Sequence, residues 1–166
     1  FGFRCGFLGL LHMEIIQERL EREYDLDIVV TAPSVEYEVL LNTGETIRID
    51  SPVQLPDEGK IAEIREPWMK LQIFSPTEFY GTIMELVRKR RGVFVSQDYP
   101  APNRVQMNFE IPLAELIVNF FDELKSRTKG YASMDYQIAD YRAGNLVKLE
   151  VLVGGENAVV SEVFFP

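Results

Sequence analysis

The chain has 166 residues, 46% of them hydrophobic, and a formal net charge of −9. This length suits one ordinary domain or two small ones, and the acidic balance argues against a general nucleic-acid binder. No apolar run is long enough to span a bilayer. Cys5 is the only cysteine, which excludes a disulfide or a cysteine-based zinc site within these residues.

The first 35 residues predict a strand, a helix and a second strand. Residues 1–9 form an apolar run punctuated by glycines, residues 10–24 have a helical pattern, and residues 26–33 are strand-like. Two strands and one helix are marginal alone. We therefore expect residues 1–35 to be the second half of a larger unit, and the chain to begin inside a domain of a longer parent.

A connector that contains a β-hairpin is expected over residues 36–66. Residues 36–41 and 45–49 can pair across a turn in which Gly44 supplies a positive φ. Residues 61–65 predict a further short strand.

Residues 67–145 predict a complete α+β domain in the order βαββαβ. Strands are expected over residues 69–73 and 105–111 from alternation of apolar and polar residues, and over residues 93–99 and 131–141 after the glycines that end the two helices. A helix with an apolar stripe is expected from Ser75 to Gly92, and a second from Pro112 to Gly130. One sheet with both helices on one face is the ferredoxin-like plan.

The basic residues of the second part of the chain gather in two groups. Residues 1–67 hold 6 Lys+Arg and 14 Asp+Glu, a net charge of −8, whereas residues 68–166 hold 11 and 12, a net charge of −1. The two groups are Arg88, Lys89, Arg90 and Arg91, and Lys125, Arg127 and Lys129. Each group closes a predicted helix, where one cation typically contributes about 0.3–1 kcal/mol against the helix dipole.

Four consecutive cations exceed what helix capping requires, so a phosphate-contacting surface is the second interpretation. We expect the two helices to run in the same direction, which would bring both groups to one edge of the domain and favour contact with structured RNA. Tyr131 follows the second group and is either a core residue or a ring that stacks on a base. Reversing Arg90 and Arg91 to Glu is then expected to weaken RNA binding with little change in melting temperature.

No residue is assigned a catalytic, cofactor-binding or metal-binding role. His12 is the only histidine, and its surroundings do not fit a His-Glu-x-x-His site. The sequence contains no Gly-x-x-x-x-Gly-Lys-Ser/Thr run, so we expect no GTP binding by these residues alone.

Runs of residues along most of the chain carry a family resemblance. In chain order they are residues 6–15 (GFLGLLHMEI), 18–23 (ERLERE), 31–33 (TAP), 37–39 (YEV), 66–67 (EP), 90–92 (RRG), 120–126 (FFDELKS) and 130–136 (GYASMDY). Together they resemble the LepA family of ribosome-binding translational GTPases, also called elongation factor four.

This resemblance implies a domain assignment. Residues 1–35 would end the third domain, and residues 67–145 would form the fifth, which is like the C-terminus of elongation factor G. Residues 146–166, whose alternation predicts strands, would enter the C-terminal domain.

The resemblance also implies a function. The parent would bind GTP and Mg²⁺ outside this chain and hydrolyse GTP on the ribosome, acting in elongation, back-translocation or ribosome assembly. Its partners would be ribosomal RNA at the large-subunit stalk base, the small subunit and tRNA, with no small-molecule substrate here. We expect a cytoplasmic, ribosome-associated monomer, with peripheral membrane association open for the parent. Ribosomal RNA contact is expected through the seven cations and Tyr131.

An alternative from a different class is a small ferredoxin-like hydrolase of the acylphosphatase type. Such an enzyme needs an Arg and an Asn placed to hold a phosphate. The turn after the first strand of the βαββαβ unit, residues 74–78, has no such Arg.

Overall fold

The computed structural model forms two compact units, residues 1–33 and residues 34–166. It describes residues 5, 7, 10–30, 35–144, 146–149, 152–153, 156–157 and 163–165. The strand expected over residues 1–9 lies almost wholly outside the described residues, as do residues 31–33 of the next expected strand.

One helix dominates the described part of the first unit. α1 (Leu10–Tyr24) confirms the helical pattern read from the sequence. Two i,i+4 ion pairs lie on it, Arg19–Glu23 at 2.9 Å and Arg22–Glu18 at 3.0 Å. Residues 26–30, expected to begin a strand, have no regular secondary structure. A strand is held by hydrogen bonds to its partner, and the described part of this unit contains no strand to pair with them.

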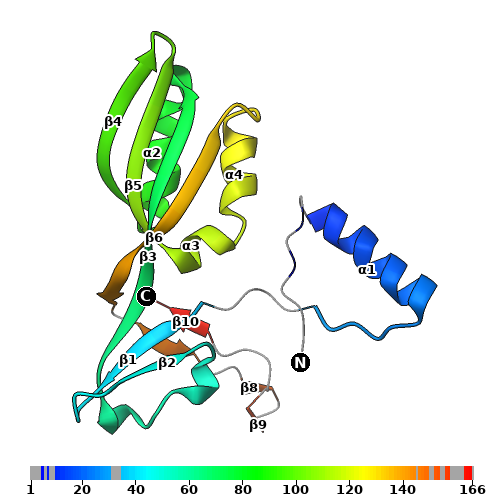
Figure 1. Ribbon diagram of the computed structural model, residues 1–166, viewed down its shortest axis with the longest axis vertical. Helices are drawn as coiled ribbons and strands as arrows, with labels where there is room; N and C mark the ends of the chain where they lie inside the picture. Colours follow the sequence, from blue (N-terminus) through cyan, green and yellow to red (C-terminus); the bar gives the residue numbers. More distant parts are fainter. Residues whose placement is uncertain are drawn as a thin grey trace. The chain divides into compact units, whose positions relative to one another are not determined.

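The second unit is built on one antiparallel six-stranded sheet (Figure 1). Its strands are β1 (Tyr37–Leu41), β2 (Thr46–Ile49), β3 (Ile61–Pro76), β4 (Val93–Ala101), β5 (Arg104–Pro112) and β6 (Ser133–Ala143). The order across the sheet is β2-β1-β3-β5-β4, and β6 also pairs with β3. β1 and β2 are the expected hairpin, with Gly44 at a φ of 88° in its turn.

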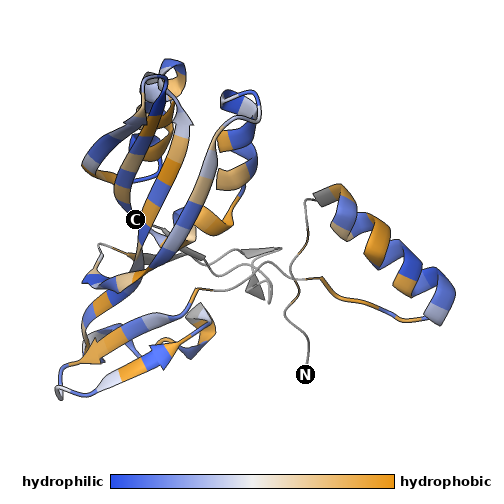
Figure 2. Cartoon of the chain, turned by 45° about the horizontal axis from the view of Figure 1, so that its top comes forward, coloured by the Kyte–Doolittle hydropathy of each residue, from blue (hydrophilic) through white to orange (hydrophobic). Residues whose placement is uncertain are grey.

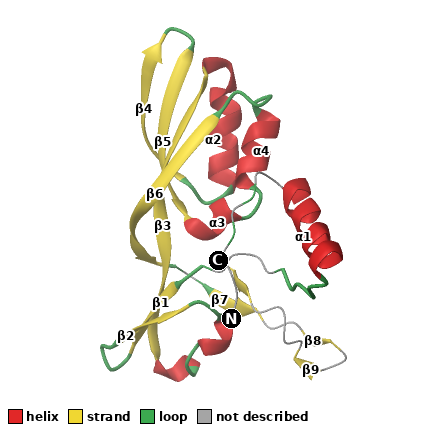
Figure 3. Cartoon of the chain, turned by 45° about the vertical axis from the view of Figure 1, so that its right-hand side comes forward, coloured by secondary structure: helices red, strands yellow, loops and turns green. Residues whose placement is uncertain are grey.

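Three α-helices accompany this sheet, and α2 and α4 lie side by side on one of its faces (Figure 3). They are α2 (Tyr80–Lys89), α3 (Leu113–Ile117) and α4 (Phe120–Arg127). The chain order from β3 to β6 is therefore βαββαβ, with strands arranged β6-β3-β5-β4. The expected ferredoxin-like fold is confirmed.

Short strands follow β6, in the region where strands were expected. β7 (Val147–Leu149) pairs with β10 (Val163–Phe165), and β8 (Leu152–Val153) pairs with β9 (Glu156–Asn157).

β3 is longer than the sequence pattern suggested. It is one strand of 16 residues where two strands, over residues 61–65 and 69–73, were expected. It runs without a break through the boundary expected at residue 67. Its first residues pair with β1 up to Arg65, and its later residues pair with β5 from Trp68 onward. The hairpin and the βαββαβ elements therefore share one sheet.

β3 also includes Ser75 and Pro76, which were expected to start a helix. Ser75 pairs with Val105 in the sheet and is fully buried, so it does not cap a helix. A 3₁₀ turn, η3 (Thr77–Phe79), separates β3 from α2.

The helix expected after Pro112 is broken into α3 and α4. Val118 is extended, with a φ of −106°, and Asn119 is left-handed, with a φ of 55°. Asn is one of the few residues other than Gly that adopts this conformation readily. The Asn119 carbonyl then accepts a hydrogen bond from the Glu123 amide at 3.0 Å, at the start of α4.

Two buried clusters explain why the break is useful. The main cluster lies between the sheet and the helices, and its largest members include Leu71, Ile83, Leu86, Phe109, Phe120 and Leu124. The hairpin cluster contains Val35, Tyr37, Val39 and Ile49. Phe120 and Leu124 of α4 belong to the main cluster, while Ala114 and Ile117 of α3 pack on the hairpin cluster. Figure 2 shows the alternating hydrophobic and hydrophilic positions along the strands that feed these clusters.

The turn after α2 supplies a test of this packing. A Cβ atom on Gly92 would lie 2.2 Å from Val87 Cγ1 and 2.9 Å from the Val87 carbonyl oxygen. We expect Gly92→Ala to lower the free energy of unfolding by about 1–3 kcal/mol, the usual cost of overpacking. Urea unfolding followed by far-UV circular dichroism measures this change.

Gly81, inside α2, is the matched control. A Cβ there would meet no heavy atom within 4 Å, so Gly81→Ala should raise the free energy of unfolding by about 0.5–1 kcal/mol through helix propensity alone. Equal effects of the two substitutions would show that the contact with Val87 does not matter.

Candidate nucleic-acid interface

The directions of α2 and α4 decide where the two groups of cations lie. β3 and β5 are antiparallel, with Trp68 opposite Pro112 and Pro76 opposite Arg104. α2 follows the Pro76 end of β3 and α4 follows the Pro112 end of β5, so the two helices start at opposite ends of the sheet. Arg90, at the end of α2, accordingly contacts the start of α4.

The expectation that both groups share one edge is therefore wrong. Each helix does leave the sheet by an equivalent crossover, but the strands that they leave point in opposite directions. We call the edge formed by residues 88–92 the α2 end. The opposite edge, formed by residues 125–131 together with η3, is the α4 end.

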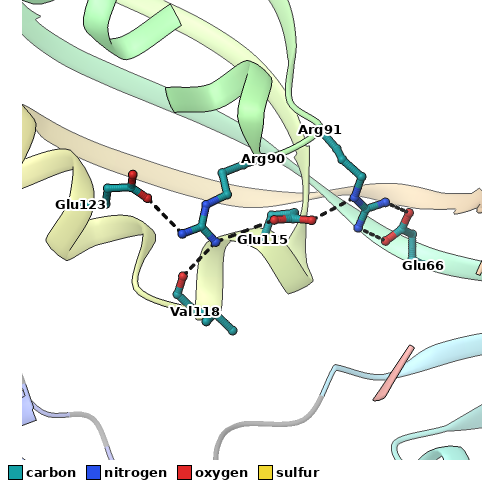
Figure 4. Close-up of polar contacts among 6 residues, drawn as sticks. All are labelled: Glu66, Arg90, Arg91, Glu115, Val118 and Glu123. Atoms are coloured by element: carbon teal, nitrogen blue, oxygen red, sulfur yellow. Dashed lines mark hydrogen bonds and ion pairs between the residues drawn. The ribbon is translucent and has the colours of Figure 1, made fainter. Parts of the chain in front are cut away.

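At the α2 end, Arg91 is held by two carboxylates (Figure 4). Its two Nη atoms donate to Glu66 of β3, at 2.7 Å to Oε1 and 3.1 Å to Oε2, and its Nε donates to Glu115 of α3 at 2.9 Å. Glu66 is only 2% exposed. A bidentate pair of this kind is the strongest common form of protein ion pair.

Arg90 extends the same network toward α4. It donates to Glu123 at 3.0 Å and to the Val118 carbonyl oxygen at 3.2 Å, and it lies 3.8 Å from Glu115. Arg127 donates to Glu123 from the other side at 3.0 Å.

Three arginines therefore meet three glutamates, and the network carries no net charge. Its members are Glu66, Arg90, Arg91, Glu115, Glu123 and Arg127. We call this set the arginine–glutamate network. Its three arginines were expected to contact RNA, but the structure gives each of them internal partners.

The network also shifts the pKa values of two side chains, Glu123 and Tyr37. Hydrogen bonds from Arg90 and then Arg127 hold the pKa of Glu123 below its ordinary value. Burial, reinforced by the negative charge of Glu66, raises the pKa of Tyr37 to about 12. Tyr37 belongs to the hairpin cluster, so the electrostatic influence of the network reaches that cluster.

α2 and α4 end in the same backbone motif. In each, a basic residue occupies the position with a left-handed backbone conformation. After α2, the Gly92 amide donates to the Val87 carbonyl at 2.8 Å, and Arg91 has a φ of 58°. After α4, the Gly130 amide donates to the Lys125 carbonyl at 2.8 Å, and Lys129 has a φ of 51°. This is the Schellman motif, in which Gly usually takes the left-handed position.

Four of the expected cations form no ion pair with any described residue: Arg88, Lys89, Lys125 and Lys129. Arg88 and Lys89 are exposed at the α2 end, and Lys129 is exposed at the α4 end. Lys125 donates to the Gly130 carbonyl at 3.3 Å and lies 5.4 Å from the centre of the Phe121 ring.

Tyr131 also belongs to the α4 end and is 60% exposed. The interpretation of Tyr131 as a core residue is therefore wrong. Among the described residues, no group of three or more His, Cys, Asp or Glu could hold a metal ion. The described helices include none long and apolar enough to cross a membrane.

Removing Arg91 should destabilise the fold strongly. Arg91→Ala would leave the buried Glu66 carboxylate without its bidentate partner, which typically costs about 3–5 kcal/mol. Arg88→Ala is the matched control, and this exposed arginine should change the free energy of unfolding by less than about 0.5 kcal/mol. Denaturant unfolding at neutral pH distinguishes the two, and equal effects would contradict a structural role for Arg91.

For the same reason, the structure leads us to expect that reversing Arg90 and Arg91 to Glu lowers the melting temperature, in place of the small change expected from the sequence. The reversal would place two new carboxylates beside Glu66, Glu115 and Glu123.

Acid should weaken the network through Glu123. Its folded pKa lies below its ordinary value, so its ion pairs stabilise the fold above the unfolded pKa and are lost as the pH falls through the folded value. We expect the free energy of unfolding of the natural chain to fall more steeply than that of Glu123→Gln between about pH 5 and pH 3. Parallel pH curves for the two proteins would show that Glu123 does not contribute.

Comparisons with known proteins agree with the fold and with the expected motifs. The family described as Elongation factor G C-terminus matches residues 63–152. A protein named Elongation factor 4 from Prochlorococcus marinus (strain MIT 9515) is 58% identical over 158 residues. Proteins of the same name from Synechococcus sp. (strain RCC307) and Halalkalibacterium halodurans are each 55% identical, over 158 and 156 residues.

These matches cover 94–95% of this chain but 26% of each relative, so the chain spans about a quarter of the length of these curated relatives. The family match extends over more than half of the chain. The resemblance to the LepA, or elongation factor four, family is confirmed, and the chain belongs to the elongation factor G C-terminus family.

Proposed function

We propose that this chain is a non-catalytic, ribosome-binding part of a translational GTPase of the elongation factor 4 type, and that it contacts ribosomal RNA. Its support is the 55–58% identity to proteins named Elongation factor 4. GTP and Mg²⁺ would bind elsewhere in the parent, because these 166 residues contain no phosphate-binding loop of the Gly-x-x-x-x-Gly-Lys-Ser/Thr type.

In this proposal the parent hydrolyses GTP on the ribosome in the cytoplasm. It acts in elongation, back-translocation or ribosome assembly, with tRNA, the small subunit and the large-subunit stalk base as partners. The acylphosphatase-type alternative gains no support from the relatives, and the η3 turn after β3 contains no Arg that could hold a phosphate.

The proposed RNA contact rests on one observation. Some of the expected cations have carboxylate partners, and the others form no ion pair with any described residue. Residues 68–166 are almost neutral overall, so attraction to phosphate must come from local charge. Arg88, Lys89, Lys125 and Lys129 supply that charge. Arg90, Arg91 and Arg127 instead support the surface from within the arginine–glutamate network.

The α4 end is the stronger of the two candidate contacts. Arg104, which is exposed and lies opposite Pro76 in the sheet, adds a third cation near this edge. The turn between β4 and β5 is tied to η3 by a hydrogen bond of 3.2 Å from the Thr77 amide to the Asn103 carbonyl. The cations of the α4 end therefore come from two segments, the end of α4 and the start of β5, and the turn before β5 is tied to η3.

Removing two of these charges should weaken binding in a salt-dependent way. In the full-length parent, Lys125→Gln combined with Lys129→Gln should reduce ribosome affinity. It should also flatten the slope of log affinity against log salt by roughly 0.7–0.9 for each phosphate that the protein no longer neutralises. Sedimentation with ribosomes at several salt concentrations measures both quantities.

Lys60→Gln is the control for removal of a positive charge, because Lys60 is exposed and paired with Asp57 away from both helix ends. Unchanged affinity and slope in the double variant, with the melting temperature preserved, would leave Lys125 and Lys129 as helix-capping charges only.

A further inference from the structure

The exposed ring of Tyr131 is supported from one side. It stacks on Phe79 of η3, with ring centroids 6.3 Å apart and ring planes 20° apart. Phe79 is 7% exposed, whereas Tyr131 is 60% exposed. Because Phe79 packs against one face of the Tyr131 ring, much of the exposed area belongs to the other face and the edges.

The backbone around Tyr131 is fixed by hydrogen bonds on both sides. Its own amide donates to the Thr128 carbonyl at 2.9 Å. The Thr128 hydroxyl donates to the Leu124 carbonyl at 2.7 Å and accepts from the Ala132 amide at 3.2 Å. Thr128 and Ala132 are fully buried. Tyr131 thus projects from an anchored loop, so little ordering of the loop is needed on binding.

Two ammonium groups lie near the Phe79 ring and the Gly130 backbone that adjoin Tyr131. The Lys129 Nζ lies 6.0 Å from the centre of the Phe79 ring, and the Lys125 Nζ donates to the Gly130 carbonyl next to Tyr131. An exposed aromatic face beside unpaired cations suits a ligand that has both a flat aromatic group and a negative charge close to it. A nucleotide in RNA meets both requirements.

We propose that Tyr131 is a stacking platform for a single unpaired nucleobase of the bound RNA, with Lys125 and Lys129 contacting the phosphates beside that base. The ligand is an unpaired base, because bases inside a helix are already stacked on their neighbours and can be stacked on a side chain only when splayed out of a loop or bulge. This inference rests on the proposed function and specifies which part of the RNA the α4 end recognises.

The test uses full-length parent protein and purified ribosomes. Tyr131→Leu keeps apolar area but removes the aromatic face, and it should weaken ribosome binding by roughly 5- to 150-fold, the range that corresponds to base–aromatic stacking. The salt slope should not change, since no charge is removed. Tyr131→Phe and Tyr131→Trp should bind within about twofold of the natural protein, because each keeps a face for stacking.

Tyr136→Leu is the control for removal of an exposed tyrosine ring. Tyr136 lies on β6 and is 48% exposed. Its substitution should leave binding unchanged. Melting temperatures of all variants check the fold, and Tyr131→Met serves as the non-aromatic variant if the Leu variant unfolds.

Chemical probing of the ribosomal RNA bases identifies the nucleotide that is bound. The natural, Phe and Trp proteins should change the reactivity of one unpaired nucleotide, and the Leu or Met variant should not. Three results would each contradict the stacking proposal. The first is normal binding by the folded Leu or Met variant, and the second is binding that is weakened equally in the Phe and Trp variants. The third is weakened binding without any change in base reactivity.

Failure of the proposed function would look different. In that case the natural protein itself would show no salt-dependent ribosome binding, or the Lys125 and Lys129 double variant would bind like the natural protein.

Discussion

A buried carboxylate sets the architecture of the second unit. β3 carries Glu66 into a position that is 2% exposed, and a buried charge is tolerated only when it is paired and hydrogen-bonded. Arg91 meets that requirement by adopting a left-handed backbone conformation just after α2. Its Nε donates to Glu115, which fixes α3 against the end of α2. The direction in which the chain leaves α2 is therefore tied to a charge on the central strand.

The same constraint separates the arginines that have carboxylate partners in the fold from the expected cations that have none among the described residues. Arg90 and Arg127 both pair with Glu123, so the first turn of α4 is tied to the end of α2 and to the last turn of α4 itself. Because the three arginines are balanced by three glutamates, the network as a whole attracts an external phosphate only weakly. The expected cations that form no ion pair with any described residue keep their charge for a partner outside the fold. A surface for RNA can then exist on a chain with a net charge of −9.

Local sequence patterns predicted most of the secondary structure but not the relations between elements. Alternation located β5 and the second half of β3, and the apolar stripe located α2. Ser75 was misplaced because its pairing with Val105 in the sheet outweighs its preference for a helix cap. The break at Val118 and Asn119 separates α3, whose Ile117 packs on the hairpin cluster, from α4, whose Phe120 and Leu124 are buried in the main cluster, and only the tertiary structure shows these two clusters.

The direction of the helices could have been derived from the sequence. The expected hairpin of β4 and β5 reverses the chain, so the strands before α2 and before α3 must be antiparallel, and the helices that follow them must be antiparallel too. The arginine–glutamate network is different, because the pairs that Arg90 and Arg91 form with Glu66, Glu115 and Glu123 join residues 24 to 33 positions apart along the chain. No local pattern in a single sequence reveals such pairs, although glutamates near the start of each segment of the second helix were a usable hint.

The two helix ends differ most clearly at one equivalent backbone position. A residue other than Gly in the left-handed region costs of the order of 1 kcal/mol or more. At Arg91 that cost is offset by the bidentate pair with Glu66 and the bond to Glu115. At Lys129 the side chain is exposed and forms no ion pair with any described residue, so nothing described within the fold offsets the cost to the same degree. The same motif thus turns one cation inward, where it stabilises the fold, and leaves the other outward beside Tyr131. This difference is the physical reason to look for the ligand at the α4 end and for structural support at the α2 end.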